Sequence, residues 1–344
     1  MTKNIIAIAI AAATFGTQAV AVELYNNDGT TFSMGGHVSV NLNGSEEGNT
    51  DVGTNSPRIN FTATQDMGNG FTVDARGEWA LNYLTNASNT FTTRLGYIGL
   101  THEDMGRAVV GTQWAPYYDV AGVTDMPIAF ANDFLYSDVA GGDFAKTGQS
   151  RADNMISYRN GVEFGEAGAL DFGLAWQGEQ DSDKDGITTG TYSDRVQVTV
   201  AYSIAGVQLG YAYSTGDVAV GTSLKESLDF NVLSAKYGSY GNGLYLAGVY
   251  QMSELDKAGE ADSYEVIAAY ALPSSLNFSI NYETVEEKYK TTGAKSTDRE
   301  ELALQVEYNF ASNIVGYTGY QFDLNDADGN KTDDAWVIGA RFYL

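Results

Sequence analysis

The chain alternates apolar and polar residues with a period of two over many separate segments. In "RVQVTVAYSI" (195–204), Val196 and Val198 alternate with Gln197 and Thr199. The same pattern runs through "LNFSINYET" (276–284), "ELALQVEYNF" (301–310) and "FTVDARGEWALNY" (71–83). This period indicates β-strands with one apolar face, and no apolar periodicity of helix length competes with it. We therefore predict an all-β protein.

Strands of this kind fit two architectures, a soluble β-sandwich and a membrane barrel that is apolar outside and wet inside. Three features favour the barrel. The segments run to about ten residues or more, the length of a tilted membrane-spanning strand. Short connections such as "DMGNG" (66–70) and "EDMG" (103–106) alternate with long acidic ones such as "NGSEEGNTDVGTN" and "GEQDSDKDGITTG". Tyr, Phe and Trp cluster near the segment ends, where aromatic girdles would lie.

The number of segments is roughly sixteen, an even number as closed outer-membrane barrels require. We predict a transmembrane antiparallel β-barrel, closed so that no strand edge leaves backbone groups unpaired in lipid. The phase of the last segment, "AWVIGARFYL" (335–344), turns Trp336 and Phe342 outward and Arg341 toward the lumen. An arginine that faced the bilayer midplane would cost about 2–4 kcal/mol. The same reasoning turns Arg58 inward.

The first residues have the pattern of a cleaved export signal. Lys3 supplies the positive end, "IIAIAIAAA" (5–13) the apolar region and "AVA" (19–21) the small-residue cleavage site. The apolar region is too short for a membrane-spanning helix, which needs about 20 residues. We predict a signal peptide over residues 1–21 and a single barrel domain over residues 22–344.

Charge and composition narrow the choice of partners. The chain carries 44 acidic and 19 basic residues, a formal net charge of −25. Nucleic acid binding needs a basic face, so we expect no nucleic acid partner and favour cations and positively charged solutes. The absence of cysteine excludes disulfides and thiolate chemistry.

The sequence shows no convincing catalytic or metal site. The two histidines, His37 and His102, lack the neighbours of a nucleophilic triad or a metal site. The stretch "DSDKDG" (181–186) resembles the start of a calcium loop, but Tyr192 stands at the twelfth position, where a glutamate is needed. We interpret it as a solvated acidic loop and expect no enzyme activity, no cofactor and no metal.

Over essentially its whole mature length, the chain resembles the general diffusion porins of Gram-negative outer membranes, especially the trimeric kind of enterobacteria and vibrios. The matching motifs are "VELYNNDG", "TRLGYIGL" (93–100), "YYDVAGVTDM" (117–126) and "RADNMISYRN" (151–160), together with the aromatic chain end. The resemblance implies a homotrimer, surrounded by outer-membrane lipid and lipopolysaccharide. Its water-filled pore would pass ions and small hydrophilic solutes, and the excess of acid favours cations.

One segment, from Pro116 to Gln149, breaks the alternation by mixing apolar residues, glycines and carboxylates without a period. A segment of this length without regular structure is either functional or evidence against the fold. In the family the third external loop folds inward and narrows the pore, and the resemblance implies the same for this segment. Five apolar residues would pack on the inner wall: Met126, Ile128, Phe130, Phe134 and Leu135. Three carboxylates would face water: Asp125, Asp133 and Asp138.

The resemblance also implies which wall residues face this constriction loop. Arg58 in "SPRINF", Arg94 in "TTRLGY" and Arg151 in "QSRADN" match the arginines of the family's pore wall. His37 in "GGHVSV" stands where enterobacterial members usually have lysine. Arginines on the wall and carboxylates on the loop would set up a transverse field that orients polar solutes.

Two positions leave the charge balance of this constriction open. Arg76 adds a wall arginine by its phase, although it could instead pair with its neighbours Asp74 or Glu78. The family's loop glutamate is missing, because a "PEFGG"-type turn has become "PIAFAND". Asp125 in "TDM" matches the first loop carboxylate, and Asp133 could partly replace the missing glutamate.

Three alternatives fit the same pattern less well. A solute-selective channel would need an aromatic slide along the lumen. A surface adhesin or receptor would carry its pore incidentally. A soluble acidic lectin with a β-sandwich fold would bury the apolar faces against each other instead of turning them to lipid.

Overall fold

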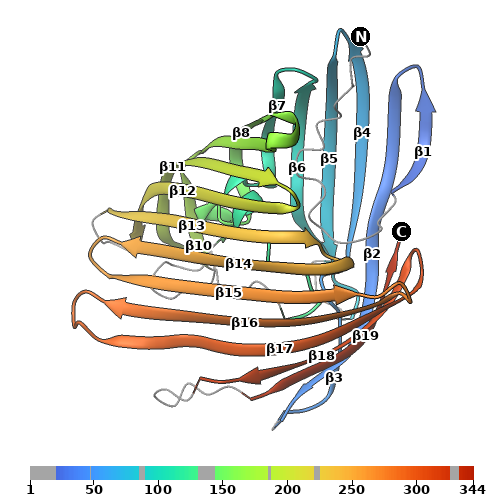
Figure 1. Ribbon diagram of the computed structural model, residues 1–344. Helices are drawn as coiled ribbons and strands as arrows, with labels where there is room; N and C mark the ends of the chain where they lie inside the picture. The colour runs from blue at the N-terminus through green and yellow to red at the C-terminus, as the bar shows by residue number, and fades with distance from the viewer. Residues whose placement is uncertain are drawn as a thin grey trace.

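The protein forms one closed antiparallel sheet of sixteen strands, with short additional strands at its ends (Figure 1). The computed structural model describes residues 21–46, 48–84, 90–130, 144–184, 187–220, 225–325 and 333–344, so the predicted export signal lies almost entirely outside the described residues. The strands of the ring are β2 (Thr30–Ser45), β4 (Arg58–Gly68), β5 (Phe71–Leu81), β6 (Phe91–His102), β7 (Gly106–Trp114), β8 (Arg151–Glu163), β9 (Ala169–Gln177), β11 (Ile187–Ile204), β12 (Val207–Val220), β13 (Glu226–Ser239), β14 (Asn242–Leu255), β15 (Gly259–Ala271), β16 (Leu276–Tyr289), β17 (Lys295–Ala311), β18 (Ile314–Asp323) and β19 (Ala335–Tyr343).

The ring closes at β2, which pairs with β4 on one edge and with β19 on the other. The pairing with β19 ends with Tyr343 opposite His37, and the pairing with β4 ends with Arg58 opposite the same His37. Every ring strand therefore has a hydrogen-bonded neighbour on both sides, which is the condition for a sheet that spans lipid. The predicted barrel and its even number of strands are confirmed.

Three short strands extend the ring at the ends of longer ones: β1 (Val22–Asn27), β3 (Asp51–Gly53) and β10 (Gln180–Lys184). β1 and β3 pair with the two halves of β2, and β10 pairs with β11. Two of the connections that we expected to be long polar loops are therefore partly strand. The solvated loop predicted over residues 181–186 is wrong in this respect, because its first four residues belong to β10.

The two faces of the sheet differ as the alternation predicts. On the outward face, Val198, Ile280 and Phe310 are exposed. On the inward face, Asn281 and Gln305 are buried, covered by chain that lies inside the barrel. The assignment of apolar residues to the outside is confirmed, and it places polar side chains around the lumen.

Tyr83 departs from the predicted phase. We expected the strand that starts at Phe71 to run on to Tyr83 with this side chain facing outward, but β5 ends at Leu81. The Tyr83 hydroxyl instead accepts a hydrogen bond from the Ser39 backbone N–H and donates to the Ser39 carbonyl oxygen. Beyond the end of a strand the period of two no longer fixes which side a residue faces.

Outward-facing aromatic side chains are tied to carboxylates in five successive hairpins. The pairs are Trp176 with Asp194, Tyr213 with Asp229, Tyr250 with Asp262, Tyr282 with Glu300 and Tyr320 with Asp334. In each pair, the acidic residue stands two positions earlier in the chain than the residue that pairs directly with the aromatic donor. The repeat forms a band of amphipathic side chains at the level expected for an aromatic girdle, and each pair links two neighbouring strands.

Inside the barrel lie two short helices, α1 (Pro116–Ala121) and α2 (Phe144–Thr147). A 3₁₀ turn, η1 (Gly165–Ala167), connects β8 and β9. The segment we expected to be irregular is therefore helical at both of its described ends. The teal coil of α1 lies behind β12 and β13 (Figure 1) and contacts both of them and β11. Among the described residues, no helix has the length and apolar character needed to cross a membrane.

Candidate pore constriction

The segment after β7 is fastened to the inner face of the barrel at its start. The Asp119 carboxylate of α1 receives the Nε–H of Arg159 at 2.6 Å, and Arg159 also donates to the Trp114 carbonyl oxygen at 2.8 Å. Farther along, Thr124 donates to the Glu265 carboxylate. Because Arg159 is on β8 and Glu265 on β15, these contacts hold the segment across the interior of the barrel.

The far end of the described segment is anchored on β16 and β17. The backbone N–H of Ile128 donates to the Glu307 carboxylate at 3.1 Å, and that of Ala129 donates to Gln305 at 2.8 Å. The Phe130 carbonyl oxygen accepts a bond from the Asn281 side chain at 2.6 Å. Ile128 and Phe130 also pack against a small apolar cluster of the wall that contains Tyr317 and Val337. The expected packing of Ile128 and Phe130 on the inner wall therefore occurs, and Met126 packs against the larger apolar cluster that contains Tyr117 and Phe230. Phe134 and Leu135 lie outside the described residues.

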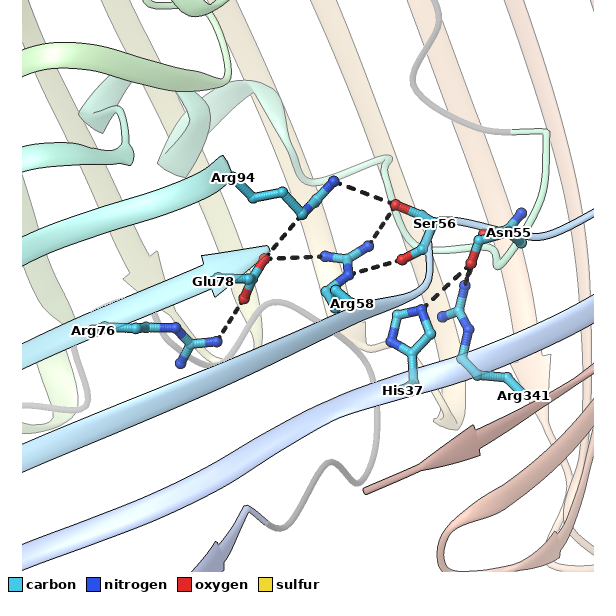
Figure 2. Close-up of polar contacts among 8 residues, drawn as sticks. All are labelled: His37, Asn55, Ser56, Arg58, Arg76, Glu78, Arg94 and Arg341. Atoms are coloured by element: carbon cyan, nitrogen blue, oxygen red, sulfur yellow. Dashed lines mark hydrogen bonds and ion pairs between the residues drawn. The ribbon is translucent and has the colours of Figure 1, made fainter. Parts of the chain in front are cut away.

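On the wall formed by β4, β5 and β6, three arginines surround one buried carboxylate (Figure 2). Glu78 on β5 is only 3% exposed. Its two oxygens receive Arg94 at 3.0 Å and Arg76 at 2.8 Å, and a nitrogen of Arg58 lies 3.8 Å away. The alternation of β4, β5 and β6 turns all four side chains inward, and the strands' register brings them together. Arg76 thus pairs with Glu78, while Asp74 pairs with Arg107.

A second group of contacts surrounds residues 55 and 56, between β3 and β4 (Figure 2). The Asn55 side-chain oxygen accepts a bond from Arg341 at 2.8 Å, and the Asn55 carbonyl oxygen lies 3.4 Å from the His37 ring. The Ser56 hydroxyl accepts from Arg58 at 2.8 Å and from Arg94 at 3.4 Å. These two residues therefore link the Glu78 group to the C-terminal strand β19.

The structure brings four of the five predicted wall residues into this cluster, namely His37, Arg58, Arg76 and Arg94. The fifth, Arg151, is the first residue of β8 and lies over the Trp114 ring, with its guanidinium carbon 5.9 Å from the ring centroid. Its charge also acts on Arg58.

Of the three predicted loop carboxylates, Asp125 lies in the described part of the chain, whereas Asp133 and Asp138 lie outside the described residues. Asp125 accepts a hydrogen bond from the Tyr118 hydroxyl and is influenced by the charges of Arg58, Arg94 and Arg341. Its carboxylate therefore faces the positive potential of the arginine wall.

Both described carboxylates of the inward segment are harder to ionise than an exposed aspartate. Desolvation raises the pKa of Asp125, even though the Tyr118 hydroxyl and the three wall arginines lower it. Desolvation likewise raises the pKa of Asp119, against the opposite effect of Arg159. Low pH therefore neutralises these two groups earlier than solvent-exposed aspartates.

Sequence reasoning missed three parts of the cluster. Glu78 was considered only as an alternative partner for Arg76, and its role as a common anchor depends on cross-strand register that the sequence does not show. Arg341 was assigned to the lumen but not to the constriction, because nothing local links the chain end to β4. Asn55 was the last residue of a predicted polar loop, and Ser56 was the first residue of the motif "SPRINF" without a role of its own.

The chemistry available here is electrostatic. The cluster contains hydrogen-bond donors and charges of both signs on facing walls, which can orient and sort solutes. Among the residues that the structure describes, no group of three or more acidic or histidine side chains could hold a metal ion.

Comparison with known proteins connects this architecture to one family. A family model described as Gram-negative porin matches residues 7–328. Outer membrane protein S2 of Salmonella typhi is 27% identical over 390 residues, covering 98% of this chain and 99% of that protein. The solved structure of Salmonella typhi OmpF in complex with daunomycin superposes with a TM-score of 0.79 at 22% identity, covering 94% of this chain and all of that one. Vibrio cholerae OmpT in its trimer form gives a TM-score of 0.65 at 16% identity, covering 92% of this chain and all of that one.

Proposed function

Because the chain belongs to the family of Gram-negative porins, we propose that its water-filled lumen passes small cations more readily than anions. Membership in the family makes the protein a passive channel of the outer membrane and not an enzyme. The proposal concerns the preference of the channel for cations over anions and the residues that set this preference.

The observation that carries the proposal is the placement of opposite charges on facing walls. Asp125 on the inward segment lies within the electrostatic reach of Arg58, Arg94 and Arg341 on the barrel wall. A solute that passes between them meets a transverse field, which favours small hydrated ions and polar molecules that can align with it. We therefore assign the narrow part of the pore to residues 116–149 and the arginine wall.

Cation preference follows from the balance of charge around this field. The chain has 44 acidic residues against 19 basic ones, and this excess of negative charge raises the local concentration of cations around the protein. The wall arginines would attract anions, but Arg58, Arg76 and Arg94 share the negative charge of Glu78. Arg341 keeps its charge and is held in place by the neutral side chain of Asn55. The cluster thus retains less free positive charge than its number of arginines suggests.

We also propose that the protein assembles as a homotrimer within outer-membrane lipid and lipopolysaccharide. The trimer form recorded for Vibrio cholerae OmpT, which has the same fold, supports this assembly. The apolar outward face suits lipid. The carboxylates of the aromatic–carboxylate band, such as Asp229 and Asp262, could be joined to lipopolysaccharide phosphates by divalent cations.

The experiment is a reversal-potential measurement in planar bilayers under a KCl gradient. We expect a potassium-to-chloride permeability ratio above one for the native chain. Arg94→Ala combined with Arg151→Ala should raise that ratio further, because two positive charges leave the wall. Equal permeability of the native chain would refute the cation preference, and an unchanged ratio in the double variant would remove these arginines from the constriction.

A further inference from the structure

The connection between β3 and β4, two strands that both pair with β2, contains one residue more than the stretch of β2 that it faces. Asn41 on β2 stands opposite Gly53 on β3, and His37 on β2 stands opposite Arg58 on β4. Four residues, 54–57, therefore face only three, 38–40. This is the geometry of a β-bulge, which bends a strand and redirects its side chains.

The bulge is held in a specific conformation. Ser56 has a φ of +48°, in the left-handed region that residues other than glycine rarely adopt. The neighbouring Asn55 is fixed by a reciprocal pair of bonds, since its N–H donates to the Ser39 hydroxyl and its carbonyl oxygen accepts from it, each at 2.9 Å. An unusual backbone conformation persists only where the surroundings stabilise it, so these contacts define the position of the bulge.

The bulge presents hydrogen-bond acceptors to the guanidinium groups of the wall (Figure 2). Arg58 donates through Nε to the Ser56 carbonyl oxygen at 3.0 Å and through a terminal nitrogen to the Ser56 hydroxyl at 2.8 Å. Arg94 reaches the same hydroxyl at 3.4 Å, and Arg341 is held by Asn55. Donors that would otherwise bind anions from the lumen are thus engaged within the wall.

We propose that the bulge at residues 54–57 is a positioning element that holds these arginines against the wall and thereby limits anion passage. The proposal rests on the proposed function, since it takes the arginine wall as part of the constriction. Ser56 and Asn55 act through the arginines and carry no charge of their own. Of the four clustered arginines, the bulge thus restrains Arg58, Arg94 and Arg341, and Arg76 is held by Glu78.

The test compares Ser56→Gly with Ser56→Asn. Glycine adopts the left-handed conformation easily and keeps the backbone acceptor, but it removes the hydroxyl that binds Arg58 and Arg94. Asparagine tolerates the same conformation and offers a side-chain oxygen as a replacement acceptor. Ser234→Gly, which removes the hydroxyl of a buried, inward-facing serine on β13 outside the arginine cluster, is the matched control.

We expect Ser56→Gly to lower the potassium-to-chloride permeability ratio about two- to threefold, the effect of moving a unit charge a few Å closer to a passing ion. Ser56→Asn and Ser234→Gly should keep the native ratio. An unchanged ratio in Ser56→Gly, or an equal shift in Ser56→Gly and Ser56→Asn, would overturn the proposal.

A second variant covers the case in which Ser56→Gly does not assemble into a heat-resistant barrel. Ser39→Ala removes both bonds that hold Asn55 and should shift the ratio in the same direction, and an unchanged ratio would then refute the role of the bulge. The role of the bulge is judged from the difference in permeability ratio between the variants and the native chain. The proposed function is judged from the ratio of the native channel alone, so the two can fail separately.

Discussion

At the scale of single residues, the account depends on Glu78. This one carboxylate sits among Arg58, Arg76 and Arg94, and it is almost completely buried while the arginines keep some contact with the lumen. A buried carboxylate surrounded by guanidinium groups compensates charges that would otherwise repel one another. Its removal therefore affects both the stability of the wall and the charge that passing ions meet.

Glu78→Gln should lower the free energy of unfolding by about 2 kcal/mol, less than for a fully buried pair because the arginines are partly hydrated. It should also shift the reversal potential toward chloride. Denaturant titration in detergent and bilayer recordings measure the two effects. Glu286→Gln, which changes an exposed glutamate on β16, is the matched control, and equal effects of the two substitutions would contradict the assignment.

The cation preference should depend on pH through the charge of Asp125. Because desolvation raises the pKa of this carboxyl above its usual value of 3.8, protons bind it at a higher pH than they bind exposed aspartates. The negative charge is present at neutral pH and is lost as the pH falls through the raised pKa, so cation preference should start to decline above the usual aspartate range. Reversal potentials recorded in steps from pH 7 to about pH 4 test this. Asp125→Asn should remove that step, and an identical pH profile in this variant would refute the role of Asp125.

At the scale of elements, the first described part of the inward segment, residues 116–130, is held to the barrel wall at several points. Asp119 is paired with Arg159, Thr124 with Glu265, and the backbone of Ile128 with Glu307. These partners lie on β8, β15 and β17, so the segment connects strands that are distant in the ring. An element held on both sides resists the fluctuations that a free loop would show.

Breaking the Asp119–Arg159 pair tests this fastening. Asp119→Asn and Arg159→Gln should each raise the open-channel noise and lower stability by about 3 kcal/mol, the usual cost of leaving one partner of a buried pair uncompensated. The double variant should cost little more than either single one, because the second substitution removes the orphaned group. Strictly additive losses of stability would show that the two side chains act independently.

The elements were largely predictable, and the exceptions have physical causes. A period of two identifies each ring strand and its outward face, because lipid and lumen impose opposite requirements on successive residues. Tyr83 fails the rule because its strand has already ended at Leu81. The bulge before Arg58 could not be predicted, since one extra residue becomes visible only in the register between β2 and its partners.

At the scale of the whole molecule, the barrel explains how the candidate site is assembled from distant parts of the sequence. Closure at β2 brings Arg341, three residues from the chain end, next to Asn55 near its start. Individual arginines could be placed by phase and motif, whereas their common carboxylate depends on long-range geometry. Contacts between residues so distant in the sequence cannot be predicted from local sequence patterns.

The most direct test of the account is the single-channel conductance of the native protein in planar bilayers over a range of KCl concentrations. A closed ring around a water-filled lumen predicts discrete conductance steps that grow in proportion to salt concentration. Concentration-independent steps would indicate a saturable binding site in place of free diffusion. A correctly folded protein that inserts without any conductance would contradict the open lumen.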